Sequence, residues 1–305
     1  MSQSSKSQGM SEMAKNDNKN SFEVKLANHA GYCYGVERAL KMAAEAVKAH
    51  PKPIYTLGPI IHNPQVVKSF IRDGVTPVDD ISEVDEGTMI IRTHGVDPFI
   101  TKMAKKRGLK VIDATCPFVA KAQKRAGELV REGYRVVIIG ERDHPEVVGI
   151  LAHAGGQALV VESVEDLREA RRAKKIGIVV QTTQSLKKLR EVLAAVSATA
   201  SEVKVFNTIC NATIHRQDAA RELAKKADVM VVVGGKNSAN TSRLVQICRE
   251  TGTITYHLET AAELDPGWFA HAKVVGVTAG ASTPERLLKE VAADIELIGK
   301  KVDSR

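Results

Sequence analysis

Three of the four cysteines recur at similar intervals along this chain of 305 residues. Cys33, Cys116 and Cys210 are separated by 83 and 94 residues. Each follows an extended apolar run and precedes residues whose apolar positions repeat with the period of a helix. That periodicity is weakest after Cys210. The pattern predicts three copies of one α/β unit, each with a cysteine at the start of a helix.

Two sets of polar side chains repeat together with the cysteines. The first set follows them by 28 or 29 residues and comprises His62, His144 and Ser238. The second set follows them by 61 to 72 residues and comprises His94, Thr182 and Ser282. Sites in parallel α/β sheets are built at the carboxyl ends of the strands. We therefore expect all nine positions to converge on one centre.

The predicted strands arrange the chain as a closed ring. They lie at 22–27, 89–91, 110–112, 135–139, 158–161, 176–180, 203–209, 229–233, 253–257 and 273–277. We expect an α/β fold of three similar units around a pseudo-threefold axis, at 35–115, 116–206 and 207–297. The third unit lacks a strand, which the N-terminal segment 22–34 supplies. The polar residues 1–21 are expected to be a disordered tail, and residues 298–305 a C-terminal tail.

Composition narrows the classes of function. The sequence has no run of about 18 apolar residues, so we expect no membrane span. It also lacks an apolar segment near the N-terminus of the kind that directs secretion, so we expect a cytoplasmic location. The net charge of +8 indicates an anionic partner. Aromatic residues make up only 4% of the chain and its cations are scattered along helical stretches, which argues against nucleic acid.

The cysteines themselves indicate a metal centre. Helix N-termini favour thiolate over thiol, and thiolate is the form that binds metal. Structural zinc sites usually have paired cysteines a few residues apart, which this chain lacks. Three dispersed thiolates suit an iron–sulfur cluster at the centre of the three units, with one iron open to substrate. Cys248 has no polar neighbours of this kind and is predicted to be a buried structural residue.

The polar set indicates an anionic ligand and a proton donor. Hydroxyl, amide and imidazole groups are well suited to phosphate oxygens, and the segment 234–238 is predicted to add backbone amides. No Walker loop and no dinucleotide fingerprint is present. Glu146 lies two residues after His144. In a closed apolar pocket burial would raise its pKa, so that it could deliver a proton near neutrality, with Thr182 as a relay.

Short motifs throughout the chain resemble the 4-hydroxy-3-methylbut-2-enyl diphosphate reductases, the last enzymes of the non-mevalonate isoprenoid pathway. The resemblance runs from about residue 23 to 297. The motifs are Gly31-Tyr32-Cys33-Tyr34-Gly35-Val36, His62-Asn63, Thr93-His94-Gly95-Val96, Asp113-Ala114-Thr115-Cys116-Pro117, His144-Pro145-Glu146-Val147, Gln181-Thr182-Thr183, Cys210-Asn211-Ala212-Thr213, Lys236-Asn237-Ser238 and Thr278-Ala279-Gly280-Ala281-Ser282.

The resemblance implies a cofactor, a substrate and a role for each site residue. The cofactor is one 4Fe-4S cluster with three cysteine ligands and an open iron, which meets the hydroxyl of an allylic hydroxymethyl diphosphate. Glu146 and Thr182 deliver the proton that lets the hydroxyl leave as water. Two electrons from ferredoxin or flavodoxin complete a reaction that yields isopentenyl and dimethylallyl diphosphate. The diphosphate is held by His62, His94, His144, Ser238, Asn240 and Ser282.

Two departures from the family pattern and two rival functions stay open at this point. Ala239 offers only a backbone N–H where many members have a second serine, and some members continue beyond the position of Arg305. One rival is a non-catalytic iron–sulfur sensor whose basic surface binds nucleic acid. The other is a zinc-bound structural or scaffolding protein.

Overall fold

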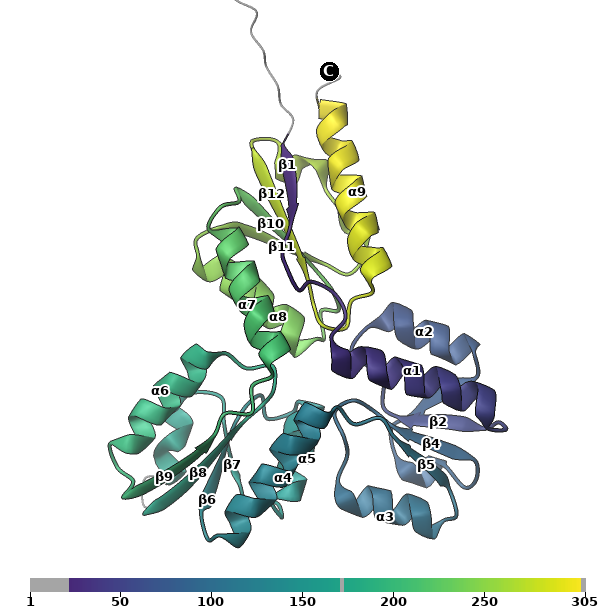
Figure 1. Ribbon diagram of the computed structural model, residues 1–305, viewed down its shortest axis with the longest axis vertical. Coiled ribbons are helices and arrows are strands. Elements are labelled where there is room, and N and C mark those ends of the chain that lie inside the picture. Colours follow the sequence, from purple (N-terminus) through teal and green to yellow (C-terminus); the bar gives the residue numbers. More distant parts are fainter. Residues whose placement is uncertain (1–21, 171–172, 303–305) are drawn as a thin grey trace, which may run out of the picture.

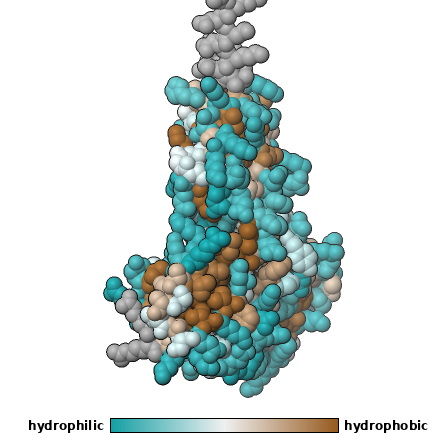
Figure 2. Space-filling view, turned by 60° about the vertical axis from the view of Figure 1, so that its left-hand side comes forward, coloured by the Kyte–Doolittle hydropathy of each residue, from teal (hydrophilic) through white to brown (hydrophobic). Residues whose placement is uncertain are grey.

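Three sheets of four parallel strands form the framework of the protein. The computed structural model describes residues 22–170 and 173–302. Figure 1 shows three lobes around a common centre, with helices packed on the sheets. Polar side chains cover most of the face seen in Figure 2, and apolar side chains gather in one area below the upper lobe. The fold is therefore α/β with three similar sheets, as the repeat predicts.

The first two sheets each come from one continuous part of the chain. The first has the order β3-β2-β4-β5, with β2 at Ile54–Leu57, β3 at Val75–Val78, β4 at Thr88–Ile91 and β5 at Lys110–Asp113. The second has the order β7-β6-β8-β9, with β6 at Arg135–Ile139, β7 at Leu159–Val161, β8 at Lys175–Val180 and β9 at Glu202–Phe206.

The third sheet joins the two ends of the chain. Its order is β1-β12-β10-β11, with β1 at Glu23–Leu26, β10 at Val229–Val233, β11 at Ile254–Leu258 and β12 at Val274–Ala279. β1 pairs with β12 in parallel, from Glu23 opposite Val274 to Leu26 opposite Val277. The predicted closure of the ring by the N-terminal strand is confirmed by this pairing.

Helices connect the strands and cover the sheets. They are α1 at Tyr34–Ala49, α2 at Pro64–Arg72, α3 at Pro98–Lys106, α4 at Pro117–Arg131, α5 at Pro145–His153, α6 at Leu186–Ser197, α7 at Asn211–Ala224, α8 at Ala239–Glu250 and α9 at Glu285–Val302. Central strands such as β10 are buried along their whole length, which explains their unbroken apolar sequence. No helix in the described part of the chain is both long and apolar enough to cross a membrane.

Several predicted boundaries differ from the observed ones, and for two of them the structure shows the local reason. The strand expected at 203–209 ends at Phe206. Beyond it, the side chain of Thr208 takes the place of the backbone in pairing with Val180. Its hydroxyl oxygen accepts from the Val180 N–H at 2.8 Å, and the hydroxyl donates to the Val180 carbonyl at 2.5 Å. Residues 298–302, expected in a tail, belong to α9. Ile298 packs against the core of the third sheet there. Residues 1–21 and 303–305 lie outside the described residues, and the unit boundaries stay a prediction.

Candidate active site at the centre of the three units

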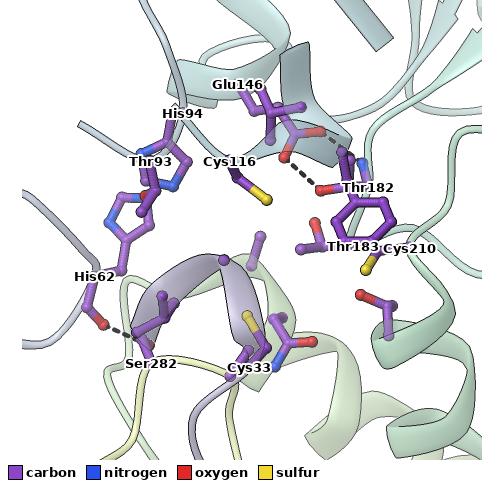
Figure 3. A pocket seen from close by; sticks show the side chains of 18 of the residues that line it. Cys33, His62, Thr93, His94, Cys116, Glu146, Thr182, Thr183, Cys210 and Ser282 are labelled. Atoms are coloured by element: carbon purple, nitrogen blue, oxygen red, sulfur yellow. Dashed lines mark hydrogen bonds between the residues drawn. The ribbon is translucent and has the colours of Figure 1, made fainter. Parts of the chain in front are cut away.

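One cavity at the centre of the ring is lined by every residue predicted for the site. Its empty space is about 720 Å³, part of it open to solvent. Figure 3 shows sulfur, imidazole and carboxyl groups facing this space from all three units. The twelve predicted residues that line it are Cys33, His62, His94, Cys116, His144, Glu146, Thr182, Cys210, Ser238, Ala239, Asn240 and Ser282.

Each of the three cavity cysteines is the N-cap of a helix. Cys33 precedes α1, Cys116 precedes α4 and Cys210 precedes α7, and none of the three side chains makes a capping hydrogen bond. A Cβ atom at Gly35 would lie 2.5 Å from Sγ of Cys116 and 3.9 Å from Sγ of Cys33. Glycine is therefore required at this position of α1, because any side chain would fill the space beside the two sulfur atoms.

The predicted preference for thiolate was wrong for Cys116 and Cys210. Burial raises the pKa of Cys116 to about 11 and also raises that of Cys210. The first backbone N–H groups of α4 and α7 lower these two pKa values, as predicted, but the loss of water outweighs their effect. Cys248 lies apart, fully buried in an apolar cluster with Leu244, as predicted for a structural residue.

Three imidazole rings form a cluster on one side of the cavity. The ring centroids of His62, His94 and His144 lie 4.6 to 5.5 Å apart. Burial is the main cause that lowers the pKa of His62 to about 4 and of His144 to about 3, and that of His94 falls well below its usual value. The nearby guanidinium of Arg92 lowers all three further. The rings are therefore neutral at pH 7.

This neutral cluster favours an anion over a cation. Its nitrogens lie within 4.8 Å of one another, a spacing that could also hold a metal ion, but the positive charge of Arg92 opposes one. Among the described residues, both nitrogens of His62 and Nδ1 of His94 have no hydrogen-bond partner. Nδ1 of His144 accepts the Glu146 backbone N–H at 3.1 Å, so its Nε2 carries the proton. Such groups are free to donate to phosphate oxygens.

Glu146 and Thr182 form a closed pair at the opposite side of the cavity. The Thr182 backbone N–H donates to one carboxyl oxygen of Glu146 at 2.6 Å, and the Thr182 hydroxyl donates to the other at 2.8 Å. Figure 3 shows both bonds. Glu146 is 2% exposed, and burial raises its pKa to about 7 although both hydrogen bonds lower it. The carboxyl group can therefore hold a proton near neutrality, as predicted.

The third group of polar residues surrounds the start of α8. Ser238 is the N-cap of this helix, and the two side-chain polar atoms of Asn240 are buried with no partner among the described residues. The first amides of a helix also lack intrahelical partners, so Ala239 offers its N–H. The Ser282 hydroxyl donates to the backbone carbonyl of His62 at 3.0 Å and links the third unit to the first.

The glycine-rich segment 234–238 contributes fewer free amides than predicted. The N–H of Lys236 donates to the carboxylate of Glu259 at 2.7 Å, and the N–H of Ser238 donates to the carbonyl of Gly235 at 3.0 Å. Its main contribution to the cavity is thus the position of Ser238 and the start of α8. The backbone of Gly234 has φ at 149°, which only glycine adopts readily.

Sequence reasoning missed two cationic residues and one glycine at the centre. Arg92 directly precedes the Thr93-His94 motif, and its Nε has no partner among the described residues. Arg216 lies on the buried face of α7. The signal for Arg216 was the weak apolar periodicity after Cys210, because polar residues occupy that buried face. Gly35 gave no signal, since nothing in the sequence shows how near the sulfur of Cys116 comes.

With this geometry established, comparison with known proteins identifies the family. A family model described as LytB protein matches residues 24–296. The chain belongs to the LytB family. A curated LytB relative from Geobacter sp. (strain M21) is 51% identical over 280 residues, which cover 92% of this chain and 99% of the relative. Another, from Aquifex aeolicus (strain VF5), is 47% identical over 279 residues, 90% of this chain and 96% of the relative. Both are named 4-hydroxy-3-methylbut-2-enyl diphosphate reductase.

Two solved structures share the fold with this LytB protein. The structure of (E)-4-hydroxy-3-methyl-but-2-enyl diphosphate reductase, the terminal enzyme of the non-mevalonate pathway, is 47% identical with a TM-score of 0.68, and the match covers 90% of this chain and 99% of that one. The E-1-hydroxy-2-methyl-but-2-enyl-4-diphosphate reductase from Plasmodium falciparum is 30% identical with a TM-score of 0.85, covering 90% and 87%. The family expected from the motifs is confirmed.

Proposed function

We propose that the chain reduces 4-hydroxy-3-methylbut-2-enyl diphosphate with two electrons and two protons, removing its hydroxyl as water to give isopentenyl and dimethylallyl diphosphate. The observation that carries the proposal is the single cavity that joins three sulfur atoms, a buried protonatable carboxyl and a group of unpartnered phosphate donors. Relatives up to 51% identical are named for this reductase, which supports the same substrate here.

A 4Fe-4S cluster held by Cys33, Cys116 and Cys210 fits the residues at the centre. Three cysteines among the cavity residues leave one iron of such a cluster without a protein ligand. The glycine at position 35 leaves room beside two of the sulfur atoms. When bound, this cluster would supply the electrons and an open coordination position for the substrate. Ferredoxin or flavodoxin in the cytoplasm is proposed as the electron donor, and the net charge of +8 suits an acidic partner.

The polar groups opposite the cysteines are proposed to hold the diphosphate. His62, His94 and His144 would donate from one side, and Ser238, Asn240 and Ser282 with the amide of Ala239 from the other. Neutral imidazoles donate one proton each, and Arg92 behind them contributes a full positive charge. This division lets the cavity bind a multiply charged anion without burying several cations side by side.

Glu146 is proposed to supply a proton through Thr182. Both of its carboxyl oxygens are bonded to Thr182, so a proton on Glu146 reaches the cavity by way of the Thr182 hydroxyl. The carboxyl donates to the Thr182 oxygen while the Thr182 hydroxyl donates to the leaving oxygen of the substrate. A hydroxyl leaves far more readily as water than as hydroxide, so this transfer lowers the barrier.

An anaerobic assay tests the proposed function. The purified protein is incubated with the hydroxymethylbutenyl diphosphate and a chemical reductant, and its iron, sulfide and zinc contents are measured in the same preparation. We expect iron, sulfide and both five-carbon diphosphates. Zinc without iron or sulfide, or an iron–sulfur protein that forms neither product, would contradict the proposal.

Arg92→Met is expected to weaken substrate binding more than catalysis. The guanidinium lies near all three imidazoles, and its loss removes about 1–3 kcal/mol of attraction for the diphosphate, so KM should rise on the order of tenfold. Turnover at saturating substrate should change by less than about threefold. Arg72→Met on the exposed end of α2 is the control and should leave both constants unchanged. A normal KM for Arg92→Met would show that Arg92 does not contribute to diphosphate binding.

A further inference from the structure

Arg216 is a deeply buried cation on the helix that begins at Cys210. Its side chain is 3% exposed and lines the central cavity. Nη2 donates to the carbonyl of Gly31 at 2.8 Å, and Nη1 donates to the carbonyl of Ala212 at 3.2 Å. Gly31 lies two residues before Cys33, so this side chain connects the segments that carry two of the three cavity cysteines.

These hydrogen bonds leave the charge of Arg216 without a counter-ion. Among the described residues Arg216 makes no ion pair, and its Nε is buried with no hydrogen-bond partner. Carbonyl oxygens satisfy N–H groups but carry no net negative charge. A guanidinium buried without a negative partner costs several kcal/mol, so such groups are found paired in folded proteins.

The candidates for a negative partner are the sulfur atoms of Cys33 and Cys210, which line the same cavity as Arg216. Burial lowers the pKa of Arg216, and the charges of Cys33 and Cys210 act against this by favouring its protonated form. Both cysteines are partly buried. Binding a cluster converts the thiols to thiolates, because thiolate is the ligand form. The partner that Arg216 lacks is therefore created when the cluster binds.

We propose that Arg216 is a positioning residue that supplies the counter-charge of the cluster-bound thiolates of Cys33 and Cys210, and so holds the cluster and makes it easier to reduce. The inference rests on the cluster of the proposed function. One-electron reduction adds one negative charge to the cluster. A fixed positive charge beside two of its ligands stabilises the reduced state more than the oxidised state and so raises the reduction potential.

The test is a potentiometric titration of the intact iron–sulfur protein, with the spectrum of the reduced cluster as the readout. Arg216→Met removes the charge at similar length, Arg216→Gln removes it but keeps an amide for the backbone carbonyls, and Arg216→Lys keeps it. Arg221→Met is the control, because this residue of α7 pairs with Asp218 on the surface. A second measurement follows the release of iron to a chelator.

We expect the midpoint potential to become more negative in the Met and Gln variants. At a fixed solution potential their ratio of reduced to oxidised cluster should fall on the order of tenfold. They should also release iron faster. The Lys variant should stay close to the wild type in potential, and the control should match it in both measurements. If the Met variant does not fold, the Gln variant decides the outcome.

A purely structural role predicts a different pattern. If Arg216 only fixes the Gly31 and Ala212 carbonyls, the Lys and Gln variants would release iron at the same rate. Neither variant would then change the midpoint potential of the cluster. An unchanged potential in the neutral variants, with a normal cluster in the wild type, overturns the inference and leaves the proposed function intact. A wild-type protein without iron and sulfide contradicts the proposed function instead.

Discussion

Glu146→Gln is expected to lower turnover on the order of 10³-fold while the protein keeps its cluster. Glutamine matches the shape of the acid and its oxygen can still accept from Thr182, so the cavity should stay assembled. The amide cannot give up a proton at neutral pH, and the Thr182 hydroxyl then has no source from which to recover one. Anaerobic turnover and the iron content of the same sample are the measurements.

The pH dependence separates proton delivery from a merely structural role for Glu146. Burial raises its pKa to about 7, so the carboxyl is protonated below that pH and ionised above it. A proton donor acts in its protonated form, and turnover of the wild type should therefore fall as the pH rises through about 7. A bound diphosphate adds negative charge nearby, which moves the fall to higher pH. The variant should lack this fall.

A carboxylate outside the cavity provides the control. Asp143 is exposed and lies three residues before Glu146, in the loop that leads into α5, so Asp143→Asn changes the charge nearby without touching the cavity. Its turnover and pH profile should match the wild type. Turnover of Glu146→Gln within a few-fold of the wild type would exclude Glu146 as the proton source, and Thr182 would then need another partner.

The repeated cysteines and polar residues predicted the ring of three units, because a repeat can be recognised from the spacing of residues in the sequence alone. Strands at 135–139 and 229–233 were predicted with their observed bounds, since both consist mostly of β-branched residues and are buried along almost their whole length. The joining of β1 to β12 followed from counting strands in each unit. These features follow from the spacing of the repeat and from the number of strands in each unit, both of which can be read from the sequence.

Features that depend on single side-chain contacts between distant residues, or on the burial that such contacts produce, could not be predicted. The strand before Cys210 ends early because Thr208 bonds Val180, 28 residues away. The thiol pKa values depend on how much water the finished cavity excludes, which a helix N-terminus alone does not determine. In the sequence, Arg216 only interrupts the apolar periodicity of a predicted helix. Its hydrogen bond to the carbonyl of Gly31, 185 residues away, shows which part of the molecule it faces.

Cys116→Ser is expected to remove the cluster and with it all measurable turnover. A serine oxygen is a harder and far less acidic ligand than a cysteine sulfur, and it reaches less far into the cavity. Two remaining thiolates cannot hold a cluster that already lacks a fourth protein ligand. The fold should survive, because the Cys116 side chain makes no capping bond to α4. Iron, sulfide and visible absorbance after anaerobic purification, together with circular dichroism, measure both effects.

Cys248→Ser is the matched control because the same change is made outside the cavity. Cys248 is fully buried beside Leu244, where a hydroxyl must be satisfied by the carbonyl of Ala220, the present acceptor of the thiol at 4.0 Å. We expect a loss of about 1–3 kcal/mol in the free energy of unfolding and a normal iron content. A cluster retained by Cys116→Ser but lost from Cys248→Ser would make Cys248 the ligand, and the threefold correspondence of the cysteines would then have no functional meaning.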